Sequence, residues 1–552
     1  MAAKKKMRGG KVFVIPKLSW SLAALLWLIP ITNAYAHDVM PGMTNISGSE
    51  RLGKVAFENS CKPSVKVEFN RGVALLHSFW LDEAERTFEK VAAADPDCAM
   101  AYWGEAIANL HQINGEPSAA DLTAGRTALA KADVAREQSP REAGYIKATH
   151  RFFDGYDPNE YFDYAQRYAD AMGALSAAYP TDLEAKLFYA LGLLAADPPD
   201  DAALTNPRKA VAILNPLLLE HPDHPGIAHY ILHACDNPEM AKEGLDAARR
   251  YASIAPASPH ALHMPSHIFA RLGLWQDDIR SNLASKAAAE RNDGMHIGAE
   301  NRLHAMEFLE YAYLQVGHDD EARKILEEAQ TVKANDVDPA YPDYWTTVEA
   351  RFPVLFAIET QDWAAAERLQ PIAGGGTLSR GLTLLAHAIA AGHLHDGRTG
   401  TEATQAYDAL LSKEPIVHPG GGLATLRDEI HAWADFSQGN HEAARKLLQA
   451  IAERQRKVGK GEVELPAGEM LADMLLLDGK PKEALQAYHA SLQSDPNRFN
   501  ALLGAGRAAE LSGQPAVAAR YYRTLLVNCA GANGAALGVL EHTRAVVTAI
   551  PE

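Results

Sequence analysis

Small, aromatic and proline residues recur at fixed intervals along this chain of 552 residues. Near the N-terminus Gly72, Ala84, Phe88 and Pro96 follow one another at intervals of 12, 4 and 8 residues. Near the C-terminus the same marks return in two consecutive units: Gly479, Ala484, Tyr488 and Pro496, then Gly506, Gly513, Ala518 and Tyr522. A period of about 20–50 residues indicates an array of stacked units. The chain is also long for a single hydrophobic core.

These marks resemble those of the tetratricopeptide repeat (TPR), and the match extends over most of residues 65–525 with irregular spacers. In that helix–turn–helix unit, small residues let two helices approach, an aromatic residue fills the gap, and proline ends the second helix. The resemblance implies an all-α fold, a right-handed α-solenoid of TPR-like repeats with a concave inner groove. We expect an N-terminal TPR solenoid over residues 61–330 and a C-terminal one over 331–552.

The N-terminus has the layout of an export signal. Basic residues as far as Lys17 precede the apolar run LSWSLAALLWLIPIT (18–32). Ala34 and Ala36 then form the A-x-A pattern that signal peptidase reads. These features predict that the protein leaves the cytoplasm.

We therefore expect a signal peptide over residues 1–36, a mature chain that begins at His37, and a linker over 37–60. The expected location is periplasmic or secreted. An uncleaved membrane anchor is the alternative, and Pro30 and the short apolar run make it the weaker one. No later segment has the ~18 apolar residues that a membrane-spanning helix needs, so we expect no stable span after signal cleavage.

The formal net charge is −17. A general nucleic-acid-binding protein needs a basic surface, so we expect no nucleic-acid partner. The sequence contains no phosphate-binding loop, dinucleotide fingerprint, H-E-x-x-H motif or nucleophile elbow. These absences predict that the protein uses no nucleotide cofactor.

Two histidine pairs stand out in the middle of the chain. GIAHYILHACDNPEM (226–240) contains His229 and His233, and PHALHMPSHIFARLG (259–273) contains His263 and His267. Both members of the first pair recur 34 residues later, which is one TPR period. Residues four apart on a helix lie on one face, one turn apart. Each pair therefore presents two imidazoles on the same face of a helix.

The TPR resemblance implies that these four histidines face the concave groove from two adjacent helices, together with Asp236, His260 and His304. Imidazole nitrogen ligates zinc and copper, and a nearby carboxylate can ligate or orient a ring. The sequence therefore predicts one divalent-metal site on His229, His233, His263 and His267, with Asp236, His260 or His304 in support. The alternative is that these histidines line a polar groove or cap helices without a metal.

A further resemblance is clearest over residues 61 to about 330. The segments HYILHACD and HALHMPSHIFARLGLW, preceded by CAMAYWGEA (98–106), resemble a family of exported bacterial TPR proteins. This resemblance implies fold and location, and it adds no reaction. We expect an exported scaffold that binds a peptide or protein partner in its groove and holds a divalent zinc or copper ion. The alternative is a metal-dependent envelope enzyme that uses the histidine cluster.

The first repeat unit lies between two of the four cysteines. Cys61 precedes its first helix and Cys98 follows its second, and antiparallel helices bring those two ends together. A disulfide would fasten this unit, whereas two free thiols are the alternative. Cys235 lies within an apolar helix, where we expect it to pack as a small hydrophobic residue.

Overall fold

The computed structural model describes residues 51–550, except residues 115, 137, 199–200, 292–297, 334–341, 415–420 and 462. Contacts divide the chain into Met1–Ser49 and Glu50–Glu552, and the description below concerns the second unit. The predicted signal peptide and most of the predicted linker lie outside the described residues. Our division near residue 330 stays a prediction.

Twenty-six α-helices, numbered in chain order, form the described part of the protein. The N-terminal helices are α1 (Lys66–His77), α2 (Leu81–Ala94), α3 (Ala99–Ala108), α4 (Ala119–Val134), α5 (Pro140–Phe153), α6 (Tyr161–Ala178), α7 (Leu183–Ala195) and α8 (Thr205–Glu220). The central helices are α9 (Pro225–Cys235), α10 (Ala241–Ile254), α11 (Pro259–His263), α12 (Pro265–Arg271), α13 (Trp275–Arg291), α14 (Gly298–Gln315), α15 (Asp319–Ala329) and α16 (Pro342–Glu359).

The C-terminal helices are α17 (Trp363–Arg368), α18 (Thr377–Leu394), α19 (Gly397–Leu411), α20 (Gly422–Ser437), α21 (His441–Val458), α22 (Ala467–Leu477), α23 (Pro481–Ser494), α24 (Phe499–Leu511), α25 (Pro515–Asn528) and α26 (Ala536–Ala549). Three short 3-10 helices are η1 (Pro63–Val65), η2 (Gln112–Asn114) and η3 (Pro158–Glu160). The only β-pairing among the described residues is an isolated bridge between His318 and Asn533. No described helix is long and apolar enough to cross a membrane.

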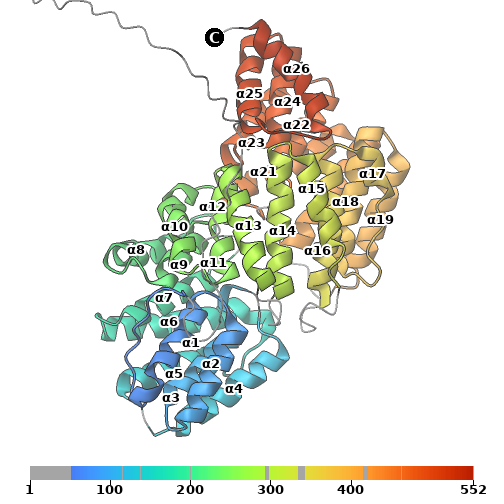
Figure 1. The fold of residues 1–552 in the computed structure, drawn as a ribbon. Helices are drawn as coiled ribbons and strands as arrows, with labels where there is room; N and C mark the ends of the chain where they lie inside the picture. Colours follow the sequence, from blue (N-terminus) through green and yellow to red (C-terminus); the bar gives the residue numbers. More distant parts are fainter. Residues whose placement is uncertain are drawn as a thin grey trace, which may run out of the picture. The chain divides into compact units, whose positions relative to one another are not determined.

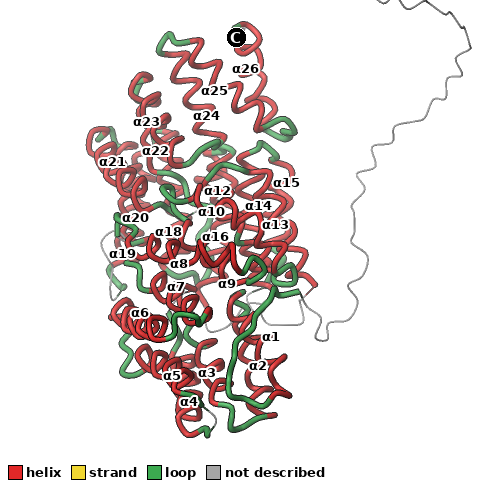
Figure 2. Tube along the Cα trace, turned by 90° about the vertical axis from the view of Figure 1, so that its left-hand side faces the viewer, coloured by secondary structure: helices red, strands yellow, loops and turns green. Residues whose placement is uncertain are grey.

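Consecutive helices pack against each other along most of the chain, which confirms the predicted all-α solenoid of TPR-like hairpins (Figure 1). Figure 2 shows the same helices as a stack joined by short loops. The small and aromatic residues of the repeat pattern contact each other as predicted. A Cβ on Gly72 of α1 would lie 2.8 Å from the ring of Phe88 on α2. Near the C-terminus Gly506 faces Tyr522 in the same way, and both aromatic rings are fully buried.

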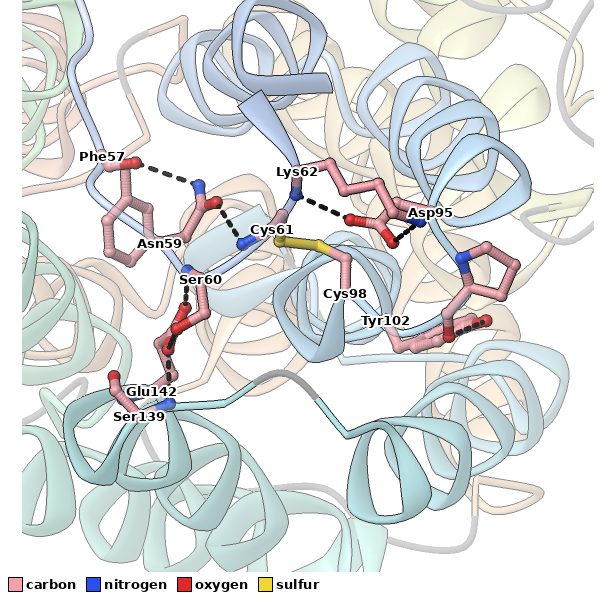
Figure 3. Close-up of a disulfide and its surroundings, with 11 residues drawn as sticks. Phe57, Asn59, Ser60, Cys61, Lys62, Asp95, Cys98, Tyr102, Ser139 and Glu142 are labelled. Atoms are coloured by element: carbon pink, nitrogen blue, oxygen red, sulfur yellow. Dashed lines mark hydrogen bonds and ion pairs between the residues drawn. A yellow bond between two sulfur atoms is a disulfide. The ribbon is translucent and has the colours of Figure 1, made fainter. Parts of the chain in front are cut away.

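Cys61 and Cys98 form a disulfide at the predicted position, with their Cα atoms 4.8 Å apart (Figure 3). Lys62 donates from its backbone nitrogen to Asp95 at 2.8 Å and from its ammonium at 2.9 Å. Ser60 donates to Glu142, at the start of α5, from both its backbone nitrogen and its hydroxyl. The segment before α1 is thereby fastened to both neighbouring hairpins.

The second histidine-bearing unit departs from a simple repeat. Its first helix is broken into α11 and α12 at Met264, because Pro265 has no N–H to donate and cannot continue the hydrogen-bond ladder. His263 therefore ends one short helix, and His267 lies in the next. The corresponding helix of the preceding unit, α9, is continuous.

The end of α12 is held by a segment that is distant in the sequence. Trp275 donates its indole N–H to the carbonyl of Asn497 at 2.8 Å, and the Asn497 amide donates to the carbonyl of Gly273 at 3.2 Å. Gly273 has a φ of +62°, and a Cβ there would lie 2.3 Å from the carbonyl oxygen of Pro496. Glycine is the residue that both adopts this positive φ readily and leaves room for the Pro496 carbonyl, so this position fixes the path of the chain after His267.

Candidate metal centre

Three histidines converge where α9 meets α11, and we call His229, His233 and His260 the first triad. The Nε2 atom of His229 lies 3.0 Å from Nε2 of His233 and 3.0 Å from Nε2 of His260. His229 is fully buried, whereas the other two rings are partly exposed. The first triad is thus mostly shielded from solvent.

The other nitrogen of His229 is already engaged. Its Nδ1 donates to the backbone carbonyl of His77, at the end of α1, over 2.6 Å. Burial lowers the pKa of His229 well below its usual value, and the neighbouring His233 adds to this effect. A neutral imidazole has one N–H and one lone pair. Because Nδ1 carries the proton, Nε2 presents a bare lone pair to the other two rings.

A second set of three histidines lies beside the first, and we call His263, His267 and His304 the second triad. The Nε2 atoms of His263 and His267 are 2.9 Å apart. The ring of His304, on α14, has its centroid 4.4 Å from that of His263. In each triad the ligand atoms lie within 4.8 Å of one another. The helices that carry both triads, α9, α11, α12 and α14, are neighbours in the fold (Figure 1).

Outer hydrogen bonds also orient the rings of the second triad. His263 donates from Nδ1 to the amide oxygen of Asn282, on α13, at 2.6 Å. His267 donates from Nδ1 to Asp236 at 2.8 Å, and the other oxygen of Asp236 accepts from Arg271 at 2.9 Å. Burial is also the main reason that the pKa of His263 lies well below its usual value. As in the first triad, the Nε2 atoms are left to face one another.

This geometry suits a transition-metal ion. Zinc–nitrogen bonds of about 2.0–2.1 Å at tetrahedral angles place two ligand nitrogens about 3.3 Å apart. The observed spacings of 2.9–3.0 Å are close to that value. Metal-bound histidines usually donate their second nitrogen to a carbonyl, an amide or a carboxylate. Four of these rings do so, since His304 also meets Glu307 through Nδ1 at 3.3 Å. Each triad would leave one position open for water or a substrate.

The structure divides the residues singled out in the sequence into two groups. His229 and His233 lie in the first triad, and His263 and His267 lie in the second. His260 and His304, which we expected in support, are each the third member of a triad. Asp236 holds His267 through its outer nitrogen. All seven residues thus gather in one region, but as two three-histidine sets.

Sequence reasoning missed several residues that shape this region. The ring of Phe79 lies 4.4 Å from that of His229, and the ring of Phe308 lies 4.7 Å from that of His263. Asn282 and the carbonyl of His77 orient ligand rings. No pattern in the sequence marks Asn282 or Phe308, because each lies on a different helix from the histidine that it contacts. Phe79 stands beside a visible signal, since it ends the stretch LLHSF, which also contains His77.

A third cluster, His77, Glu184 and His224, is fully buried and differs in chemistry. His77 meets one oxygen of Glu184 through Nε2 at 2.7 Å, and His224 meets the other at 3.1 Å. Here a ring nitrogen faces a carboxylate oxygen, so hydrogen bonds satisfy the contacts without a metal. The cluster fixes the end of α1, whose last carbonyl orients His229.

Comparisons with known proteins bear on the fold alone. No protein-family model and no curated protein matches the chain. Among solved structures, it is similar to the TPR domain of P58(IPK), with 12% identity over 88% of this chain and 99% of that one and a TM-score of 0.19. It is also similar to an APC/C hetero-tetramer of Cut9 and Hcn1, with 14% identity over 87% and 90% and a TM-score of 0.32.

A third similar structure is a monomeric mutant of IFIT1 with Gppp-AAAA, with 12% identity over 77% of this chain and 90% of that one and a TM-score of 0.34. The TPR-like repeat structure of this chain rests on its own consecutively packed helix pairs. The low identities and TM-scores carry no argument about what it binds, which must come from its own side chains.

Proposed function

We propose that the protein is an exported TPR-like scaffold that holds two divalent transition-metal ions, one on each histidine triad. The observation that carries this proposal is the convergence of three Nε2 atoms at His229. An sp2 nitrogen has a single lone pair, so it accepts one good hydrogen bond. The Nε2 atoms of His233 and His260 both lie 3.0 Å from this nitrogen, so its single lone pair faces two neighbours. A metal ion resolves this, because each of the three lone pairs then has its own bond to the ion.

The ligand set favours zinc or copper. All six ligands are imidazoles, which suit these metals, whereas magnesium and calcium prefer oxygen. Elemental analysis of the protein, purified without a polyhistidine tag and offered zinc and copper, tests the proposal. We expect about two equivalents per chain, one for each three-histidine set. Less than about a tenth of an equivalent of either metal would overturn it.

The scaffold part of the proposal concerns a peptide or protein partner in the concave groove. The TPR-like stacking of helix pairs supports it, because solenoids of this kind offer an extended concave surface. Retention of a partner from an envelope extract by the immobilised protein, with the metal-free protein compared in parallel, is the test. Failure to retain any partner across a range of salt concentrations would count against this part.

A metal-dependent enzyme is the second candidate function. It is favoured by the number of ligands, since catalytic sites keep three protein ligands and an open position, whereas structural zinc sites use four. His304 has a side chain that is 40% exposed, so the second triad is within reach of a solute. Turnover of an ester, peptide or phenol substrate by the metal-loaded protein, lost in His304→Ala, would select this candidate over the scaffold.

A further inference from the structure

The two triads are neighbours on one short helix. His260 belongs to the first and His263 to the second, both lie on α11, and their ring centroids are 6.4 Å apart. Two bound ions would therefore lie on adjacent triads.

The surroundings disfavour a high positive charge. The six ligands are neutral imidazoles, and two carboxylates that contact them are also paired with arginines: Asp236 with Arg271, and Glu307 with Arg351. Burial raises the pKa of a third carboxyl near His267, that of Asp278, well above its usual value, which favours its neutral form. Phenylalanine rings pack on each triad, with Phe79 4.4 Å from His229 and Phe308 4.9 Å from His267. Burying uncompensated charge in apolar surroundings is costly. Two Cu(I) ions bring half the charge of two Zn(II) ions, so this environment favours Cu(I).

Phe79 separates the first triad from a small cavity. The cavity is lined by apolar side chains and the turn at residues 111–112, and it holds about one water-sized molecule. Its apolar lining residues are Leu76, Phe79, Leu81, Ile107, Phe188 and Leu191. Phe79 has a φ of +49°, which is unfavourable for a bulky residue. Strained backbone of this kind is concentrated at functional sites. An apolar space of this size suits a small uncharged molecule better than an ion or a polar metabolite.

We propose that the paired triads bind two Cu(I) ions that together reduce dioxygen to peroxide. This inference rests on metal occupancy of both triads, as proposed above. In the step, each Cu(I) gives one electron and becomes Cu(II). Dioxygen takes both electrons, its O–O bond is retained as peroxide, and each oxygen bonds to one copper at the position that the three imidazoles leave open. No proton and no further reductant is needed for this single turnover.

The test uses the full chain, purified without a polyhistidine tag, made metal-free and loaded anaerobically with Cu(I). Oxygen-saturated buffer is then added, and dioxygen uptake and the peroxide released on acidification are measured. We expect two Cu(I) bound per chain, and one dioxygen consumed and one peroxide recovered for every two copper ions. A lower yield of peroxide per copper, with copper oxidised one electron at a time, would overturn the proposal.

His304→Ala is the informative variant, because this partly exposed ring can be removed while the first triad stays intact. We expect it to bind one Cu(I) and to react with dioxygen at least about tenfold more slowly, since the second electron is no longer held beside the first. His489→Ala removes an exposed histidine that contacts Tyr521, far from the triads in the sequence, and should behave as wild type.

The outcomes separate the two proposals. If neither zinc nor copper binds, both proposals fail. If two zinc or two copper ions bind but no peroxide forms, the reaction with dioxygen is wrong and the metal centre stands. If His304→Ala reacts as fast as the wild type while binding a single copper, the pairing of the triads is wrong.

Discussion

The Nε2 atoms of His229 and His260 lie 3.0 Å apart, although the two residues belong to different helices, α9 and α11. Each of these rings has a pKa well below its usual value, chiefly because it is buried. A shared metal ion would give the lone pair of each nitrogen a bond of its own. The contact also links two consecutive repeat units.

The first prediction concerns metal stoichiometry. His233→Ala removes a ligand from the first triad only, and His267→Ala removes one from the second only. We expect each single variant to lose about one of the two metal equivalents and the double variant to lose nearly all, because two ligands hold an ion far less tightly than three. Mass spectrometry of metal content checks this.

His489→Ala serves as the control and should keep both equivalents, since this exposed ring contacts Tyr521 and Gln493. If His233→Ala alone released all the metal, the four histidines of the two pairs would form one site, as the sequence first suggested.

The second prediction concerns pH. Burial lowers the pKa of His229, His260 and His263 well below 6.5 in the folded protein. These rings therefore stay neutral, and able to ligate, at pH values where an exposed histidine is protonated. We expect metal to remain bound as the pH falls through 6.5 and to be released at a lower pH. Release centred at or above pH 6.5 would contradict the buried geometry.

The same three histidines make the stability of the metal-free protein depend on pH. Their pKa is lower in the folded state than in the unfolded state, so below about pH 6.5 the unfolded state binds more protons. The stabilisation is therefore complete above about pH 6.5 and is lost as the pH falls toward the folded pKa values. Urea midpoints at pH 7.5 and 5.5 should show a fall for the metal-free wild type and a smaller fall for His263→Gln.

Part of this architecture could be read from the sequence, and the reason is local. Gly72 and Phe88, or Gly506 and Tyr522, meet within one hairpin, so their spacing alone predicts the contact. The pair of His229 and His233 is equally local, because residues four apart on the continuous helix α9 share a face. The Cys61–Cys98 disulfide follows from the same hairpin geometry.

The division into two triads could not be read in this way. It depends on contacts between helices, because His260 of α11 reaches His229 of α9 and His304 of α14 lies beside His263. It depends as well on bonds between distant segments, such as that from His229 to the carbonyl of His77. A repeat period reports which residues are equivalent along the chain, whereas ring orientation is decided by these distant partners.

The third prediction tests the close approach of helices in the last hairpins. A Cβ on Gly506 would lie 2.1 Å from the ring of Tyr522, which is fully buried. We expect Gly506→Ala to force that ring to shift and to cost about 1–3 kcal/mol in the free energy of unfolding. Gly538→Ala is the matched control, because nothing lies within 4 Å of its added Cβ. Within α26 it should be neutral or stabilising by about 0.5–1 kcal/mol, as thermal denaturation would show.

The fourth prediction concerns the disulfide. The Cys61–Cys98 bond closes a loop with a sequence separation of 37 residues. Cys61→Ser/Cys98→Ser should lower stability by on the order of 2–4 kcal/mol, because the unfolded chain regains freedom. The first effect should be easier proteolysis near the N-terminal hairpin. Wild type treated with a reductant should match the double variant, and an unchanged cleavage rate would show that the bonds from Lys62 and Ser60 suffice.

The last prediction separates the two triads through an outer hydrogen bond. Asp236 accepts from His267 and from Arg271, and its charge favours a metal-bound imidazole. Asp236→Asn keeps the shape but removes the charge, so we expect the affinity of the second triad for its ion to fall by about 10–100-fold. The first triad should keep its affinity, because His229 is oriented by the carbonyl of His77 instead. Competition with a zinc chelator, which resolves a tight and a weak equivalent, measures both.

The control is Glu510→Gln, which removes a carboxylate from the exposed His542 and should leave both affinities unchanged. Equal weakening of the two equivalents by Asp236→Asn would mean that the substitution acts through the fold, and that Asp236 has no specific role at His267.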